Sequence, residues 1–177
     1  MTGIDTNFLV DLDIIESPRH KKAEEIFRNW LFTDEPLFIY YHVFLEYQHI
    51  VTDSKRFSKA LTMEESIERS VFWQNQERIK VIYPDGASQN LAQSWIKQYK
   101  LGRKRIIDTN LAAAYFSHNI QTIWTATPAD FEIFSCFHII HHPLKAGAVK
   151  IGAAPSVVHV LAIDAQAVLG GKLLQDG

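Results

Sequence analysis

Hydrophobic and polar positions along the first 142 residues alternate between short apolar runs and longer stretches with helical spacing. The apolar runs predict strands at residues 2–5, 37–41, 79–83 and 122–127, and residues 133–140 form a last apolar run. Between them, apolar residues recur every three or four positions, which is typical of amphipathic helices. Strands that alternate with helices favour parallel pairing, so the pattern predicts an α/β layered sheet.

Local signals set the expected helix ends. Ser17 followed by Pro18 predicts a helix N-cap and first helical position. The sequence Pro84-Asp85-Gly86 is a turn signature, and Gly102 marks the expected end of the following helix. The predicted helices cover residues 8–13, 18–31, 42–51, 63–73, 88–100 and 108–118.

Composition narrows the function classes. The net charge of −2 gives no overall attraction to nucleic acid or membrane, so a polyanion would have to bind a local patch. Cys136 is the only cysteine, which excludes an intramolecular disulfide and a cysteine-based zinc site. No signal-peptide pattern and no run of about 18 apolar residues is present, so we expect a cytoplasmic protein without membrane association.

The composition changes at Pro143. Residues 143–177 hold five of the eight glycines and no aromatic residue, and the alternation of apolar and polar runs stops. We therefore expect a catalytic domain over residues 1–142 and an Ala/Gly-rich extension of unknown role over residues 143–177. Residues 157–169 could form one more helix or strand, could be poorly ordered, or could stem from a shifted reading frame.

The tetrapeptide Ile-Asp-Thr-Asn occurs at residues 4–7 and again at residues 107–110, each time running into apolar residues. Both Asp5 and Asp108 are therefore expected at junctions between buried segments, where a charge is costly unless it binds something. Each could also simply cap the helix that follows it.

Two further carboxylates fall near the same predicted sheet edge. Glu46 lies in a largely apolar helix and Asp130 follows the strand at residues 122–127, although the first could be a solvated helix residue and the second a turn residue. Carboxylates gathered at one sheet edge would bind Mg²⁺ or Mn²⁺, and such a site supports metal-assisted phosphodiester hydrolysis.

These motifs, in this order, resemble the PIN-domain ribonucleases, and within them the VapC-like toxins of prokaryotic toxin–antitoxin modules. The matching segments are residues 4–10, Glu46, residues 102–114 and residues 123–131. The resemblance implies a three-layer α/β/α sandwich with a central parallel sheet of four to five strands. It also implies a Mg²⁺-dependent endoribonuclease that acts on RNA, a cognate antitoxin partner and a homodimer.

The resemblance also assigns roles to single residues. Asp5, Glu46 and Asp108 take the three main metal-binding positions, and Thr6 and Asn7 would support them by hydrogen bonds. The family usually carries Asp or Asn where this chain has Thr127, which brings no negative charge. Asp130 would replace it as a catalytic carboxylate if the loop at Pro128 turns it inward.

Two alternatives stay open, the first of them because of Thr127. One is a catalytically weak PIN-like module that binds RNA or protein, and the other is a phosphatase-like hydrolase with the same metal chemistry.

A basic segment precedes Asp108. No acidic residue occurs from Gly86 to Ile107, and this interval contains basic residues that would contact RNA phosphates: Lys100, Arg103, Lys104 and Arg105. Trp95 in the same interval has the helical spacing of a core residue. Two other patterns give weaker evidence of a metal site. Glu46-Tyr-Gln-His49 lacks the second copy that a di-iron site needs. His138, His141 and His142 are better explained as surface or hydrogen-bonded histidines than as zinc ligands.

Overall fold

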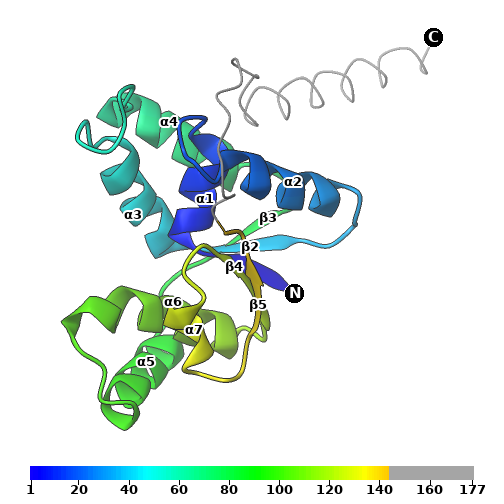
Figure 1. The fold of residues 1–177 in the computed structure, drawn as a ribbon. Coiled ribbons are helices and arrows are strands. Elements are labelled where there is room, and N and C mark those ends of the chain that lie inside the picture. The colour runs from blue at the N-terminus through cyan, green and yellow to red at the C-terminus, as the bar shows by residue number, and fades with distance from the viewer. Residues whose placement is uncertain (144–177) are drawn as a thin grey trace.

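Five parallel strands form the centre of the computed structural model, which describes residues 1–143 (Figure 1). The order across the sheet is β3-β2-β1-β4-β5, and every neighbouring pair is parallel. This confirms the predicted parallel α/β fold. The strands are β1 (Thr2–Ile4), β2 (Leu37–Tyr40), β3 (Ile79–Ile82), β4 (Thr122–Thr125) and β5 (His138–His141).

Helices cover both faces of the sheet and complete the three layers (Figure 1). One layer contains four helices that pack on one another: α1 (Thr6–Asp13), α2 (His20–Leu31), α3 (Tyr41–Val51) and α4 (Met63–Gln74). The other contains α5 (Gly86–Gln98), the 3₁₀ turn η1 (Arg103–Arg105), α6 (Ile106–Ser117) and α7 (Ala129–Glu132).

The central strand β1 defines where a ligand can bind. It pairs with β2 on one side and with β4 on the other, so the chain leaves the sheet in opposite directions at the carboxyl ends of β1 and β4. Such a switch point in the strand order is where α/β sheets bind ligands. Asp5 directly follows β1, and Thr125 is the last residue of β4.

Tyr115 of α6 connects the ends of β1 and β2, where the regular ladder between them stops. Its fully buried hydroxyl accepts hydrogen bonds from the backbone N–H groups of Ile4 (3.2 Å) and Tyr40 (3.3 Å), and donates to the carbonyl of Ile4 (2.6 Å). A Cβ at Gly3 would lie 2.5 Å from the Tyr115 ring, so only glycine leaves room for it. The side chain thus replaces missing backbone hydrogen bonds one residue before Asp5.

Several helices begin earlier or later than predicted. Helix α1 begins at Thr6 because Asp5 itself is the N-cap and accepts a hydrogen bond from the Thr6 N–H. Helix α6 begins at Ile106, so Asp108 lies in its first turn rather than at its start. The prediction for Ser17 was wrong: α2 begins at His20, and the Ser17 hydroxyl donates to the Asp11 carboxylate instead of capping the helix.

Helix α5 also differs at both ends. It begins at Gly86 because Asp85 and Ser88 form a capping box, which extends the helix into the predicted turn. At its other end the left-handed residue is Lys100, with φ of 52°, whereas Gly102 has extended backbone. Gly102 therefore does not terminate the helix as predicted.

Two predictions from the sequence concern membrane association and the C-terminal extension. Among the helices of residues 1–143, none combines the length and the apolar character that crossing a membrane requires. The predicted extension lies outside the described residues from residue 144 onward.

Replacing Tyr115 by Phe should destabilise the protein by about 1–3 kcal/mol, because two buried N–H groups and one carbonyl lose their partner. Chemical denaturation of the two proteins measures the difference. Tyr99→Phe is the matched control, since this half-buried tyrosine packs its ring on Phe134. Equal denaturation midpoints for wild type and Tyr115→Phe would contradict the role assigned to the hydroxyl.

Candidate active site

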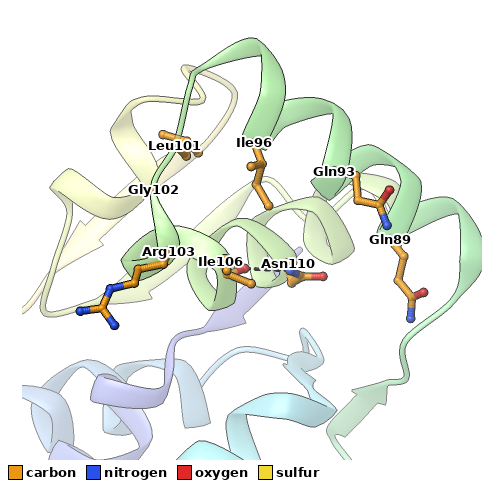
Figure 2. A pocket seen from close by; sticks show the side chains of 8 residues that line it. All are labelled: Gln89, Gln93, Ile96, Leu101, Gly102, Arg103, Ile106 and Asn110. Carbon is orange, nitrogen blue, oxygen red and sulfur yellow. Dashed lines mark hydrogen bonds between the residues drawn. The ribbon is translucent and has the colours of Figure 1, made fainter.

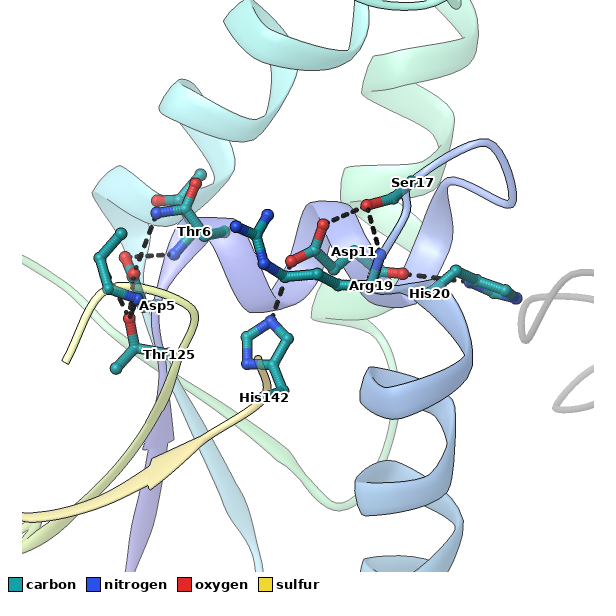
Figure 3. Close-up of polar contacts among 10 residues, drawn as sticks. Asp5, Thr6, Asp11, Ser17, Arg19, His20, Thr125 and His142 are labelled. Carbon is teal, nitrogen blue, oxygen red and sulfur yellow. Dashed lines mark hydrogen bonds and ion pairs between the residues drawn. The ribbon is translucent and has the colours of Figure 1, made fainter. Parts of the chain in front are cut away.

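Asp5 is a nearly buried carboxylate at the switch point of the sheet, with 5% of its surface exposed. One carboxylate oxygen accepts from the Thr6 N–H at 2.7 Å, and the other accepts from the Thr125 hydroxyl at 2.7 Å and the Asn7 amide at 3.3 Å (Figure 3). Thr125 was not singled out from the sequence. Its signal was its place at the end of the strand beside β1.

Glu46 approaches the same region from α3. Its Oε2 accepts a hydrogen bond of 2.6 Å from the Thr6 hydroxyl. Thr6 therefore binds Asp5 through its backbone and Glu46 through its side chain, and it fixes the two carboxylates relative to each other.

Asp108 enters from the opposite helical layer, in the first turn of α6, and is about a quarter exposed. Its Oδ2 lies 3.8 Å from the guanidinium Nε of Arg105. The charge of Asp108 acts on Asp5, and that of Glu46 acts on both aspartates. The three carboxylates come from three separate elements and are close enough for their charges to affect one another.

Burial dominates the titration of this group. Loss of hydration raises the pKa of Asp5 from 3.8 to about 7; the hydrogen bond from Thr125 lowers it, and the charges of Asp108 and Glu46 raise it further. The pKa of Asp108 is raised to about 6, chiefly by burial and then by the charge of Asp130, with Arg105 acting in the opposite direction. Negative charge is therefore crowded here.

The fourth position contains a hydroxyl and a carboxylate that is ion-paired with Arg105. The Thr127 hydroxyl lies 3.3 Å from the Thr125 hydroxyl, and the backbone N–H of Thr127 donates to that same Thr125 hydroxyl. Asp130, at the start of α7, accepts from the Arg105 guanidinium at 2.8 Å, and its backbone carbonyl accepts from the same guanidinium. The charge of Asp130 still reaches Asp108, but its carboxylate is held by Arg105.

The basic residues divide into two groups. Lys100, Arg103 and Lys104 are exposed, while Arg105 is partly buried and paired with Asp130. Contact of Arg105 with RNA stays a prediction, and in the structure its guanidinium serves the carboxylates. Trp95 is 9% exposed and stacks on Phe134 with 4.6 Å between ring centroids, as expected of a core residue.

A second buried polar cluster lies further along α1 and was not anticipated (Figure 3). Asp11 accepts from the Ser17 hydroxyl, and its Oδ2 lies 2.9 Å from Nε2 of the fully buried His142. Asp13 accepts from the Tyr47 hydroxyl and, at 2.9 Å, from Arg69. Because these carboxylates have basic partners, the cluster fastens α1 to the neighbouring elements. His138 and His141 are exposed, so the three histidines do not form a site.

The donor set fits a hard divalent cation. Carboxylate oxygens are the ligands that Mg²⁺ and Mn²⁺ prefer, and no basic side chain within residues 1–143 forms an ion pair with Asp5 or Glu46. In the same part of the chain, no three acidic, histidine or cysteine side chains form a ready cage for an ion. Mg²⁺ typically uses one or two protein carboxylates and keeps several waters, so it needs no such cage.

The fold and the site together define a class: an α/β protein with a carboxylate centre at the switch point of a parallel sheet. The PIN domain family model matches residues 4–127, and the chain belongs to that family. No match was found among curated proteins.

Solved structures with the same fold include VapC proteins. The VapC20 toxin of Mycobacterium tuberculosis, described as cleaving the sarcin–ricin loop, is 16% identical with a TM-score of 0.56, covering 70% of this chain and 87% of its own. VapBC-1 of nontypeable Haemophilus influenzae is 18% identical with a TM-score of 0.55, covering 79% and 96%. A toxin–antitoxin complex from Klebsiella pneumoniae is 15% identical with a TM-score of 0.54 and the same coverage.

The raised pKa of Asp5 predicts how metal-free protein responds to pH. Its native value of about 7 lies above its usual 3.8, so this stabilising contribution is complete at low pH and is lost as pH rises through about 7. In the presence of a chelator, the free energy of unfolding should fall between about pH 4 and pH 7, by on the order of 1 kcal/mol per pH unit, and level off above that range. Asp5→Asn should flatten most of this decline, leaving the smaller contribution of Asp108.

Denaturant titrations at several pH values measure the effect. Asp34→Asn, at an exposed position, is the control and should follow wild type. An Asp5→Asn protein whose stability declines as steeply as wild type would show that Asp5 does not ionise at this cost.

Proposed function

We propose that this protein is a metal-dependent endoribonuclease and the toxin of a type II toxin–antitoxin pair. The observation that carries the proposal is the buried carboxylate of Asp5 at the switch point, against which Asp108 and Glu46 direct further negative charge. A buried carboxylate such as Asp5, which has no basic partner and is repelled by neighbouring carboxylates, gains most from a bound cation.

Asp5, Glu46 and Asp108 would hold Mg²⁺ or Mn²⁺. Such an ion, when bound, would neutralise charge on a phosphodiester and promote ionisation of water. Attack of water oxygen on phosphorus with cleavage of the P–O3′ bond, and protonation of the leaving 3′-oxygen, would give 5′-phosphate and 3′-hydroxyl ends.

The remaining side chains position this set. Thr125 and Asn7 orient Asp5, and Thr6 orients Glu46. Exposed Lys100, Arg103 and Lys104 supply the positive charge that a phosphate backbone requires beside a negative centre. Arg105 holds Asp130 and moderates the charge around Asp108.

The similar structures support the choice of RNA and of a protein partner. One of them is named as a toxin that cleaves the sarcin–ricin loop, and others are toxin–antitoxin complexes. By this analogy the protein acts on single-stranded or loop RNA in the cytoplasm, is held inactive by an antitoxin and forms a homodimer.

A second candidate is a PIN-like module that binds RNA or protein with little cleavage. Thr127 favours it, because a hydroxyl stands where a carboxylate or amide is usual. The pairing of Asp130 with Arg105 adds to this, since it leaves no unpaired carboxylate among the described residues of that loop other than Glu132.

Asp5→Asn should lower RNA cleavage by about a hundredfold or more, because loss of cation binding removes several kcal/mol of transition-state stabilisation. The measurement is Mn²⁺-dependent cleavage of an RNA hairpin, followed on a denaturing gel. Circular dichroism should show unchanged folding. Asp34→Asn should cleave like wild type, and equal cleavage by Asp5→Asn would reject Asp5 as the centre of the site.

Thr127→Asp should strengthen Mn²⁺ binding on the order of tenfold, since one more carboxylate near the site adds at least ~1 kcal/mol of attraction. The added repulsion should lower the melting temperature in chelator. Titration calorimetry and thermal melts measure the two effects. Thr127→Val, which keeps the shape without charge, should show neither. If Thr127→Asp leaves Mn²⁺ affinity unchanged, this loop does not face the metal.

A further inference from the structure

A pocket of about 350 Å³ lies between α5 and α6, on the helical layer that carries Asp108 (Figure 2). Its volume is within the range of small-molecule pockets. Helix α5 contributes Gln89, Gln93 and Ile96, and α6 contributes Ile106 and Asn110. The segment between the helices closes one end with Leu101, Gly102 and Arg103.

The lining combines apolar surface with carboxamides and one positive charge. Ile96 and Ile106 offer aliphatic side chains from facing helices. The three carboxamides lie on one side of them and Arg103 lies on the other (Figure 2). None of the eight lining residues is acidic. This is the chemistry of a site for a flat, polar-edged, uncharged group attached to an anion.

We propose that the pocket binds one unpaired base of the RNA substrate, with adenine preferred, while Arg103 contacts an adjoining phosphate. The inference rests on the proposed ribonuclease function and adds to it a determinant of sequence preference. No role for Gln89, Gln93 or Asn110 follows from the catalytic chemistry.

The carboxamides are suited to reading a base edge. Gln89 and Gln93 lie one helical turn apart on α5, and their amides have no hydrogen-bond partner within residues 1–143. The side-chain amide of Asn110 donates to the backbone carbonyl of Ile106 at 2.7 Å, and the side-chain oxygen of Asn110 stays available as an acceptor. A glutamine carboxamide can pair with both N6 and N7 of adenine, which is why adenine is the expected base.

The pocket and the carboxylate centre share the first turns of α6 but use opposite sides of that helix. Ile106 and Asn110 lie two residues before and two residues after Asp108, a spacing at which helical side chains do not face the same way. Arg103, at the entrance of that helix, is exposed and belongs to the pocket wall. A strand with a phosphate near Asp108 therefore reaches the pocket by passing Arg103 around the beginning of α6.

Charge favours RNA over a protein partner at this place. From Gly86 to Ile107 the chain has no acidic residue, so both α5 and the segment leading to α6 present only neutral and positive side chains. Such a surface attracts a polyanion, and unpaired bases are the part of RNA that proteins read by edge contacts.

The test compares wild type with Gln89→Ala/Gln93→Ala for binding of short oligoadenylate and oligouridylate RNAs, by fluorescence anisotropy in chelator to prevent cleavage. Wild type should bind oligoadenylate roughly three- to tenfold more tightly, the effect of one or two hydrogen bonds. The double variant should lose this preference with an unchanged dependence on salt. Arg103→Ala should weaken both RNAs alike and reduce the salt dependence.

Asn90→Ala/Gln98→Ala is the matched control, because both residues are exposed on α5 but outside the pocket. It should keep the preference for oligoadenylate. An unchanged preference in Gln89→Ala/Gln93→Ala, or no preference in wild type, overturns the inference. A pocket variant that loses antitoxin binding or self-association while keeping the preference overturns it too, in favour of a protein-binding surface. If wild type cleaves RNA but ignores the base, only this inference fails, whereas no cleavage of any RNA rejects the proposed function.

Discussion

The hydroxyl of Tyr115 links β1 and β2 at the point where the backbone hydrogen bonds between these strands end. Strands β1 and β2 separate after Gly3 and Phe38, and the backbone groups freed by that separation would be buried without partners. A single phenol accepts from two of the N–H groups and donates to the carbonyl of Ile4. Since Asp5 follows Ile4 directly, the geometry of the carboxylate centre depends on this contact from the opposite helical layer.

Helix α1 contains two kinds of buried carboxylate, and the difference between them separates structure from chemistry. Asp11 has His142 within 2.9 Å and Asp13 has Arg69 at the same distance, so a basic group lies beside each. Asp5, at the start of the same helix, has only neutral hydrogen-bond donors and lies near other acidic side chains. Burial raises its pKa to about 7; the hydrogen bond from Thr125 lowers the pKa, and the charges of Asp108 and Glu46 raise it further. Burial alone therefore does not mark a site; burial without a basic partner does.

The sequence predicted the sheet, the layers and the positions of Asp5, Glu46 and Asp108 because apolar periodicity and strand order determine them. It did not predict Tyr115 or Gly3, since their roles depend on two strands separating next to a helix from a distant part of the chain. The error at Ser17 has a more local origin: its hydroxyl donates to Asp11, six residues earlier, and the helix begins only at His20. Alternation of apolar residues records which face is buried but not which polar atoms meet there.

Arg105 explains how the site can have a hydroxyl at its fourth position and remain ordered. Its guanidinium binds the Asp130 carboxylate and backbone carbonyl, and lies 3.8 Å from Asp108. It therefore keeps α7 against α6 and offsets part of the repulsion that Asp130 exerts on Asp108. Because Asp130 is paired with Arg105, the unpaired negative charge of the centre comes mainly from Asp5, Glu46 and Asp108. Arg103 and Lys104 form no ion pair within the described residues. The first turn of α6 thus separates a negative centre from a positive approach, an arrangement suited to an anionic chain that must lie beside both.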